Sequence, residues 1–198
     1  MAERRSRREL ICEAALDLAA EGGNHALTHQ GIDARLGLAR GSTSYYYRTR
    51  HALVSAAIAH LARRSREHFD SAASIVRPPT IEAAGNLIAD QLETLVTDRH
   101  RDVLARYALV VDAAADDELR TGLASCLFSL PAATALMDAL GASQPPDAAR
   151  DLISLLEGMV FDFAFGTRVL APGDSFAEHR ESLRTTIRLW IGTLVTSR

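Results

Sequence analysis

The sequence predicts an all-helical protein. Helical periodicity recurs along the chain, prolines fall between the periodic segments, and strand signals are missing. Apolar residues repeat at spacings of three and four, as in Leu10, Ile11, Ala14 and Leu18, which is the pattern of a helix with one buried face. The 6 prolines all follow residue 77 and separate helical patterns, because proline lacks the N–H that a helix interior needs. We find no alternating β-branched runs bounded by Asn-Gly or Asp-Gly turns.

Four helices are expected in the first part of the chain. The first covers about 5–21 and ends at Gly22-Gly23, since glycine accepts the left-handed conformation of a helix C-terminus. Thr28 is a candidate N-cap for a short second helix, His29 to Leu36, which Gly37 terminates. The other two helices are predicted at about Ala39–Tyr45 and 50–75.

Six helical segments are expected in the rest of the chain, at about 80–98, 101–115, 116–129, 131–141, 147–166 and 175–196. The segment 147–166 is apolar nearly all round, and 175–196 carries one apolar stripe. A helix that is apolar on more than one face is buried on more than one side. It therefore lies either at the centre of a bundle or against a second subunit. We predict a dimer interface at Leu152, Leu156, Val160, Leu183, Ile187, Trp190 and Leu194.

Composition places the chain among soluble globular proteins. Of its 198 residues, 47% are apolar and 24% charged, which allows one large domain or a small one joined to a larger one. No apolar run reaches the roughly 18 residues that span a bilayer, and the basic N-terminus lacks the pattern of an export signal. Cys12 and Cys126 form no metal-binding or redox pair, which fits a reducing compartment. We expect a cytoplasmic protein that does not contact the membrane.

Charge is distributed unevenly. Residues 1–70 carry 11 arginines against 8 acidic residues, whereas 71–198 carry 11 against 17. This asymmetry suggests that only the first part meets a polyanion. The excess is concentrated in Arg4, Arg5, Arg7 and Arg8, so a solvated tail explains it equally well.

The most informative stretch is 28–54, THQGIDARLGLARGSTSYYYRTRHALV. It predicts two short helices joined by a tight turn at Gly37, with a longer helix on either side. This is a helix-turn-helix arrangement, whose second helix can enter the major groove of DNA. In that second helix Arg40, Ser42, Thr43 and Ser44 are short or hydrogen-bonding, and Gly41 allows close approach. A structural three-helix subdomain is the alternative.

These residues resemble the motif of the tetracycline-repressor family of bacterial transcriptional regulators. The family's turn glycine corresponds to Gly37, its small apolar residue to Leu38 and its second glycine to Gly41. The aromatic cluster corresponds to Tyr45–Tyr47, the basic residue to Arg50 and the leucine to Leu53. The motif covers about 25 residues, and the remaining chain agrees in length and helix pattern. Ala39, Ser44 and Arg50 depart from the usual serine, tyrosine and lysine.

The resemblance implies roles for individual positions. Thr28 corresponds to an N-cap that contacts phosphate. The positions that face base edges correspond to Arg40, Gly41, Ser42 and Ser44. The positions that contact the DNA backbone correspond to Tyr45, Tyr46 and Arg50. We expect the DNA-binding set to be Thr28, His29, Arg40, Gly41, Ser42, Thr43, Ser44, Tyr45, Tyr46 and Arg50.

Other kinds of site have little support in the sequence. We find no HExxH, Walker, GxGxxG or GxSxG pattern, so no enzyme is expected. The 7 histidines lack ligand spacing, and no metal or cofactor is expected. A ligand pocket of the kind the family carries would be lined by Tyr107, Phe128, Met137, Met159 and Phe163, with Asp112 as a polar anchor. For each aromatic residue or methionine taken alone, an ordinary core position is the favoured interpretation.

We therefore expect a homodimeric regulator that binds a palindromic operator in double-stranded DNA and is released by a small molecule, most simply a repressor. Residues 1–48 would bind DNA, 49–75 would form a connecting helix, and 80–198 would bind the ligand and dimerise. The alternative is a helical ligand-binding or scaffold protein that does not bind DNA.

Overall fold

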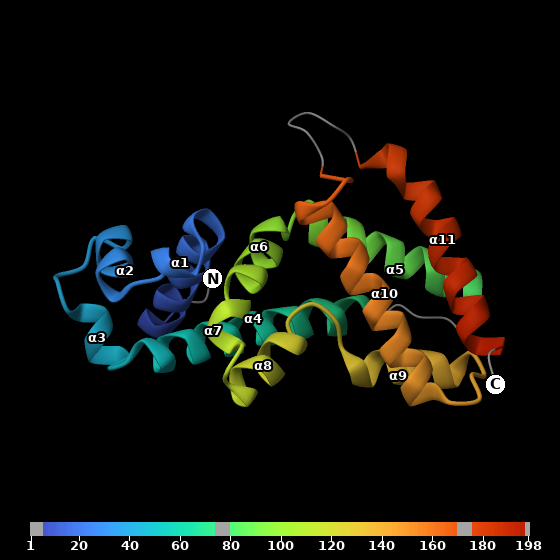
Figure 1. The fold of residues 1–198 in the computed structure, drawn as a ribbon, viewed down its shortest axis with the longest axis horizontal. Coiled ribbons are helices and arrows are strands. Elements are labelled where there is room, and N and C mark those ends of the chain that lie inside the picture. The colour runs from blue at the N-terminus through green and yellow to red at the C-terminus, as the bar shows by residue number, and fades with distance from the viewer. Residues whose placement is uncertain (1–5, 74–79, 170–175, 197–198) are drawn as a thin grey trace. The chain divides into compact units, whose positions relative to one another are not determined.

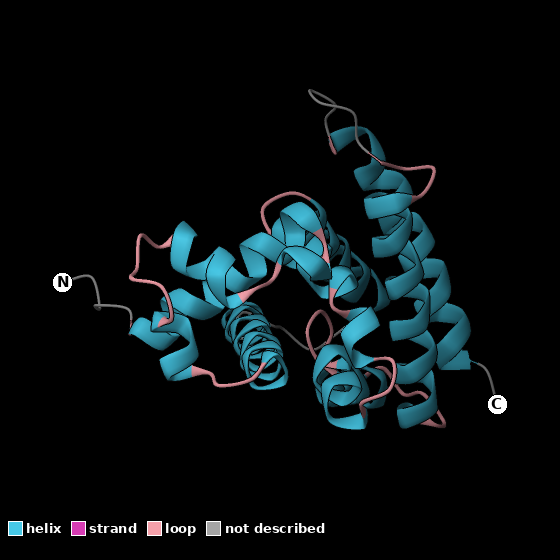
Figure 2. Ribbon diagram, turned by 60° about the vertical axis from the view of Figure 1, so that its left-hand side comes forward, coloured by secondary structure: helices cyan, strands magenta, loops and turns pink. Residues whose placement is uncertain are grey.

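The computed structural model describes residues 6–73, 80–169 and 176–196, and it confirms the all-helical prediction. Within these residues the chain forms eleven α-helices and one short 3₁₀ helix, with no strand (Figures 1 and 2). The chain divides into two compact units. The first joins the residues up to Glu67 with Arg101–Leu127, and the second joins His68–His100 with the residues from Phe128 onward. The assignment of DNA binding to residues 1–48, of a connecting helix to 49–75 and of ligand binding and dimerisation to 80–198 stays a prediction.

The first unit contains the N-terminal helices and a later segment of the chain. Its elements are α1 (Arg7–Gly22), η1 (Asn24–Ala26), α2 (His29–Arg35), α3 (Ser42–Tyr46), the greater part of α4 (Arg50–Ala73), α6 (His100–Ala108), α7 (Val110–Ala113) and α8 (Asp117–Ala124).

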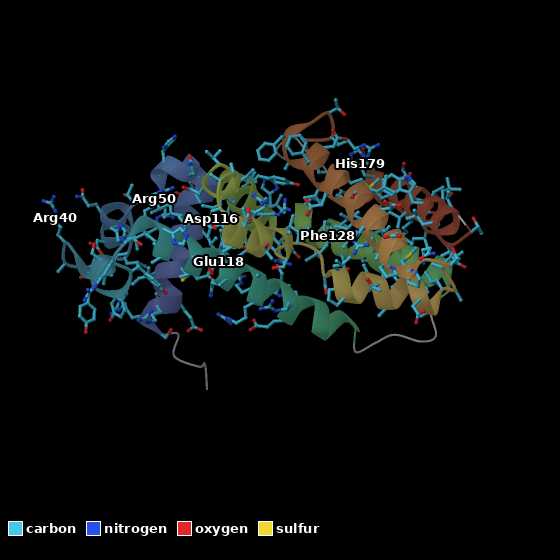
Figure 3. All side chains as sticks on the ribbon, turned by 60° about the horizontal axis from the view of Figure 1, so that its bottom comes forward. Arg40, Arg50, Asp116, Glu118, Phe128 and His179 are labelled. Carbon is cyan, nitrogen blue, oxygen red and sulfur yellow. The ribbon has the colours of Figure 1, made fainter. Side chains whose placement is uncertain are left out.

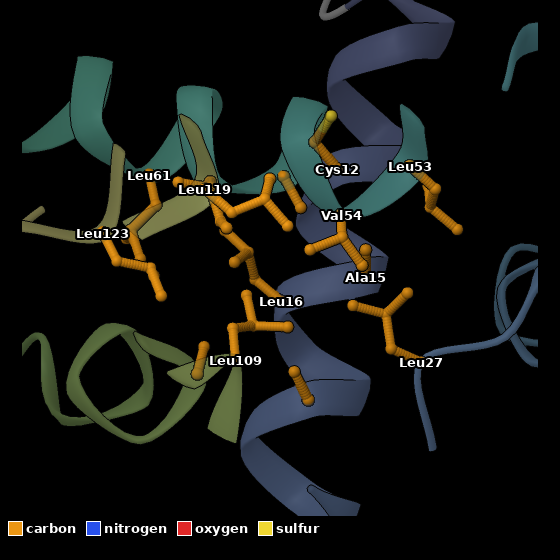
Figure 4. Packing of buried hydrophobic residues seen from close by; sticks show 14 of the residues in the cluster. Cys12, Ala15, Leu16, Leu27, Leu53, Val54, Leu61, Leu109, Leu119 and Leu123 are labelled. Atoms are coloured by element: carbon orange, nitrogen blue, oxygen red, sulfur yellow. The ribbon is translucent and has the colours of Figure 1, made fainter. Parts of the chain in front are cut away.

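One apolar core holds the first unit together. Leu16 of α1, Leu53 and Leu61 of α4, and Leu109 and Leu123 of the later segment belong to a single buried cluster, several of whose members are seen in Figure 4. Fully burying one such side chain contributes about 1.5–3 kcal/mol. The segment 101–127 is therefore part of the same packed body as α1 and α4.

A charge cluster at Glu13 joins α1, α4 and α6. The Glu13 carboxylate accepts hydrogen bonds from His60 Nε2 at 2.6 Å and Arg64 Nη1 at 2.9 Å, and also from Arg101. Burial raises the pKa of Glu13, but the hydrogen bonds from His60 and Arg101 and the nearby arginine charges outweigh it and lower the pKa to about 2. The carboxylate is therefore ionised throughout the physiological range.

The second unit consists of α5 (Ile81–Val96), α9 (Leu130–Ala139), α10 (Pro145–Phe165) and α11 (Ala177–Thr196). Helix α11 packs along α5, and α10 packs on α9 (Figure 1). Three polar pairs, about one helical turn apart, connect α5 to α11: Glu93–Arg180 at 2.8 Å, Asp90–Arg184 at 2.9 Å and Asn86–Arg188 at 3.2 Å.

Several predicted helix boundaries are wrong by a few residues. Helix α9 begins at Leu130, one residue before its predicted start. Helix α10 begins at Pro145, so that Pro145 and Pro146 lie in its first turn instead of before it. The N–H groups of a first turn have no partner within the helix, so proline is tolerated there. The predicted helix 101–115 is divided at Leu109, where no proline or glycine marks the break.

Candidate nucleic-acid interface and ligand cavity

A buried carboxylate shapes the turn between α2 and α3. Asp33 is 3% exposed. Its Oδ2 accepts the Gly41 N–H at 2.7 Å, and its Oδ1 accepts the N–H and the hydroxyl of Thr43 at 2.8 and 2.7 Å. Burial raises the pKa of Asp33, but these three hydrogen bonds outweigh it and hold the pKa below its ordinary value. Asp33 thereby satisfies N–H groups at the start of α3, where negative charge is favoured.

Two glycines permit the path of this turn. Gly37 and Gly41 have φ values of +61° and +90°, a region that residues with a Cβ rarely adopt. Gly37 ends α2 as predicted, and the Thr28 hydroxyl accepts the Gly31 N–H at 3.0 Å, which confirms Thr28 as the N-cap. Helix α3 begins at Ser42 and not at Ala39, because Gly41 occupies the N-cap position in the left-handed conformation.

The turn presents a polar surface at α3. Arg40, Gly41, Ser44 and Tyr45 are exposed, and Arg40 projects outward from the end of the unit (Figure 3). Ser42 is partly exposed and donates its hydroxyl to the Ala39 carbonyl at 2.6 Å.

The three tyrosines occupy different environments. Tyr45 is 83% exposed, and its ring meets that of Tyr46 edge-on, with centroids 5.3 Å apart. Tyr47 is buried in the core, with its hydroxyl 3.6 Å from Cys12 Sγ. The guanidinium of Arg8 lies over the rings of Tyr46 and Tyr47. Tyr45 therefore presents the most accessible phenol to a partner.

Thr43, His29 and Arg50 of the predicted DNA-binding set have side chains that bond to distant parts of the protein. Thr43 is fully buried against Asp33, so we assign it to the turn and not to the contact surface. His29 Nε2 lies 2.7 Å from the Tyr47 carbonyl oxygen. Arg50 donates to the carbonyls of Asn24 and Leu27 and to both carboxylate oxygens of Asp112 at 2.9 Å. A direct DNA contact by His29 or Arg50 stays a prediction.

Asp33 and Arg48 are absent from the sequence-based set. A carboxylate next to the apolar Ile32 in a short helix, followed by glycines at 37 and 41, is the signal that could have identified Asp33. Arg48 is exposed directly after α3, and within the described part of the chain its guanidinium has no ion-pair partner. A free cation at that place adds to the polar surface of Arg40 and Tyr45.

The second unit contains a cavity of about 340 Å³ between α5, α9 and α10. Leu87, Ile88 and Gln91 line it from α5, and Leu152, Ile153 and Leu156 line it from α10; Phe128, Ser129, Ala132, Ala133, Ala135, Leu136 and Ala139 complete it. The wall is apolar apart from Gln91 and Ser129. Such a cavity has the size and character of a small-molecule site.

Few of the predicted pocket residues line this cavity. Phe128 does so, whereas Met137 and Met159 are buried without lining it. Phe163 borders a separate hollow next to Val96 and His100. Tyr107 and Asp112 belong to the first unit, and Asp112 there contacts Arg50.

The chain matches a known protein family over much of its length. Residues 79–193, more than half of the chain, match the model of the tetracyclin repressor-like C-terminal domain. The chain belongs to the tetracycline-repressor family. Members of this family are transcriptional regulators and not enzymes. No curated protein sequence matches the chain.

Solved structures share the fold of this tetracycline-repressor family member over nearly its whole length. A transcriptional regulator from Rhodococcus sp. RHA1 is 20% identical, with 96% of each chain covered and a TM-score of 0.74. A family member from Streptomyces coelicolor is 21% identical, with 98% of this chain and 100% of the other covered and a TM-score of 0.71. The multidrug-binding protein EbrR, solved with imidazole, is 22% identical, with 98% of each chain covered and a TM-score of 0.68.

Within this family member, most of the predicted interface residues are already covered by their own chain. Leu152, Leu156, Val160, Leu183 and Ile187 are buried, and only Trp190 and Leu194 are partly exposed. The exposed apolar side chains on the same helices are Leu155, Phe161 and Phe165 of α10 and Leu189 of α11.

The described residues hold no group of three or more histidine, cysteine or acidic side chains that could bind a metal ion. Nor does any helix in the described ranges have the length and apolar character to cross a membrane.

Proposed function

We propose that the protein is a sequence-specific transcriptional regulator that binds double-stranded DNA through α3. The observation that carries this proposal is the polar surface at α3, formed by Arg40, Ser42, Ser44, Tyr45 and Arg48 and positioned by the buried Asp33 turn. Arginine and hydroxyl side chains suit base edges in the major groove. Arg48 and the Tyr45 phenol suit phosphate oxygens.

A second copy of the chain would supply the second α3. The exposed Leu155, Phe161 and Phe165 lie along one side of α10, and Leu189 lies on α11. A Cβ at Gly158 or Gly192 would meet no atom within 4 Å, so nothing in the described chain covers these glycines. A two-fold interface buries the same apolar patch on both subunits. We call the predicted DNA-binding segment of each copy, residues 1–48, its head. The dimer would then place its two heads in half-sites about 34–36 Å apart, or somewhat more, on a palindromic operator.

The cavity of the second unit would receive a small-molecule effector. EbrR, which shares this fold, has been solved with imidazole and with ethidium. We propose that effector binding changes the spacing of the two heads and releases the operator, as in a repressor working in the cytoplasm. A preference of the effector for the non-binding spacing by 2–3 kcal/mol would lower operator affinity about 30- to 150-fold.

Single substitutions test the surface at α3. Arg40→Ala should relax sequence preference and cost about 1–3 kcal/mol on the operator, whereas Arg48→Ala should weaken binding to all sequences and reduce the salt slope by about one. Arg150→Ala removes an equally charged, exposed residue of the second unit and serves as the control. Fluorescence anisotropy with labelled operator and scrambled duplexes measures all three. Operator binding that survives both head substitutions would contradict the assignment of α3.

A further inference from the structure

We infer that the cavity between α5, α9 and α10 takes an uncharged, largely apolar small molecule and discriminates against organic cations. The inference rests on the proposed effector role of this cavity and adds the chemical class of the effector. It depends on the cavity's charge, its two polar side chains and its volume.

Among the residues that the structure describes, no charged side chain lines the cavity. The cavity is open on one side, where Ala132, Ala135 and Ala139 are exposed. A cation that entered it would lose part of its hydration without gaining a carboxylate, and an anion would find neither lysine nor arginine. Moving an unpaired charge into apolar surroundings is strongly unfavourable. The lining also includes Ser129, the N-cap of α9, and the positive end of that helix dipole further disfavours a cation.

Of the described residues that line the wall, Gln91 and Ser129 alone have polar side chains. The Ser129 oxygen accepts the Ala132 N–H at 3.3 Å, so its hydroxyl hydrogen is still available. The Gln91 amide makes no hydrogen bond to any other residue that the structure describes. Together they can accommodate one or two neutral polar atoms, such as a carbonyl, a hydroxyl or the N–H of a diarylamine.

The volume limits the size of the ligand. At about 340 Å³ the cavity is more than twice the roughly 150 Å³ of an engineered cavity that binds benzene. It is also near the lower end of the roughly 300–1,000 Å³ typical of ligand pockets. A molecule of two or three rings fits this space.

Two aromatic probes of similar size and different charge test the inference on the full-length protein. N-phenyl-1-naphthylamine is uncharged and fluoresces in apolar sites, whereas proflavin is a cation. Titration of each should show N-phenyl-1-naphthylamine binding at least about tenfold more tightly than proflavin. Equal or tighter binding of proflavin, or no binding of the neutral probe, would overturn the inference.

Substitutions on α9 localise the binding. Ala133 lines this cavity, whereas Thr134, the next residue, lines a different groove. Ala133→Phe should reduce affinity for N-phenyl-1-naphthylamine at least about tenfold, and Thr134→Phe, which introduces the same ring beside it, should leave the affinity unchanged. Equal effects of the two variants would show that the probe binds elsewhere and would overturn the assignment.

Gln91→Glu tests the charge argument itself, because it introduces a carboxylate with almost no change of shape. Proflavin affinity should rise at least about tenfold, and affinity for the neutral probe should fall. An unchanged ratio between the affinities of the two probes would contradict the role of charge.

Operator binding is measured in parallel. Probe binding that leaves operator affinity unchanged would contradict the effector role while the chemistry of the cavity stands, and a protein that fails to bind DNA would contradict the proposed regulator alone.

Discussion

Asp33 connects the sequence of the turn to the position of α3. Its two oxygens accept three hydrogen bonds from Gly41 and Thr43, and its side chain is almost completely buried. A buried acceptor of this kind determines where the first turn of α3 lies, although it does not itself face the solvent. The geometry that presents Arg40 and Ser44 therefore depends on a residue that would not touch DNA.

Asp33→Ala should weaken both folding and DNA binding. The N–H groups of Gly41 and Thr43 and the buried Thr43 hydroxyl would lose their acceptor, which costs about 2 kcal/mol or more in the free energy of unfolding. Urea unfolding and operator affinity measure the two effects, and Asp33→Asn should be intermediate because its amide retains one oxygen. Asp138→Ala removes an exposed carboxylate of the second unit as a control. An Asp33→Ala variant as stable and as active as the wild type would refute this role.

Arg50 has a fork of donors that a lysine cannot reproduce. It contacts two carbonyls near η1 and the Asp112 carboxylate together, which suits the planar guanidinium. We therefore expect Arg50→Lys to lower the free energy of unfolding nearly as much as Arg50→Ala, by about 1–2 kcal/mol. Chemical denaturation of both variants measures this. If lysine restores stability and DNA affinity fully, charge alone matters and a phosphate contact becomes the better explanation.

At the scale of elements, the Glu13 cluster connects three helices of the first unit. The pKa of Glu13 is about 2 in the folded protein, below the ordinary glutamate value of about 4.3. A lowered pKa stabilises the fold fully above the unfolded value, and this contribution is lost as the pH falls toward the folded value. The loss should therefore fall between about pH 4.5 and pH 2.

Glu13→Gln should remove that pH-dependent contribution. At pH 7 the variant should be less stable by about 2 kcal/mol or more, because His60 and Arg101 lose their charged partner. Between pH 4.5 and 2 its stability should fall less steeply than that of the wild type. Denaturant unfolding at a series of pH values measures both. Glu21→Gln, at an exposed ion pair with Arg35, should have a much smaller effect, and identical pH profiles for wild type and Glu13→Gln would exclude the mechanism.

Sequence periodicity predicted the helices but not all their partners. Thr28 and Gly37 were identifiable because cap and turn chemistry is local. The partners of Asp33 lie 8 and 10 residues away along the chain, within reach of a local pattern. Arg50 bonds to Asp112, 62 residues away, and no local pattern encodes that pair. The cavity was missed for the same reason: large aromatic residues and methionines suggested its lining, but leucines, isoleucines and alanines from three helices form most of it.

At the scale of the whole molecule, the proposed dimer depends on exposed apolar side chains of α10 and α11. Phe161 and Leu189 are 51% and 66% exposed, so a glutamate at either place would be solvated in a monomer and buried unpaired in a dimer. Phe161→Glu with Leu189→Glu should yield monomers that retain their helical circular dichroism spectrum. Light scattering after size exclusion measures the mass.

Val111 provides the matched control for the dimer, because it is 69% exposed on α7 of the first unit. Val111→Glu should remain dimeric. A double variant of α10 and α11 that stays dimeric would show that another surface joins the subunits. A monomeric variant should also lose most of its operator affinity, since a single head retains only half of the contacts.

The proposed regulator requires that the first unit bind DNA. Fluorescence anisotropy of the wild-type protein, titrated onto the DNA that flanks its own gene at several salt concentrations, tests it most directly. We predict tight binding, selective over a scrambled duplex, with log affinity falling with log salt at a slope of about −0.9 for each phosphate contacted. Binding that is weak, equal for both duplexes and insensitive to salt would contradict it.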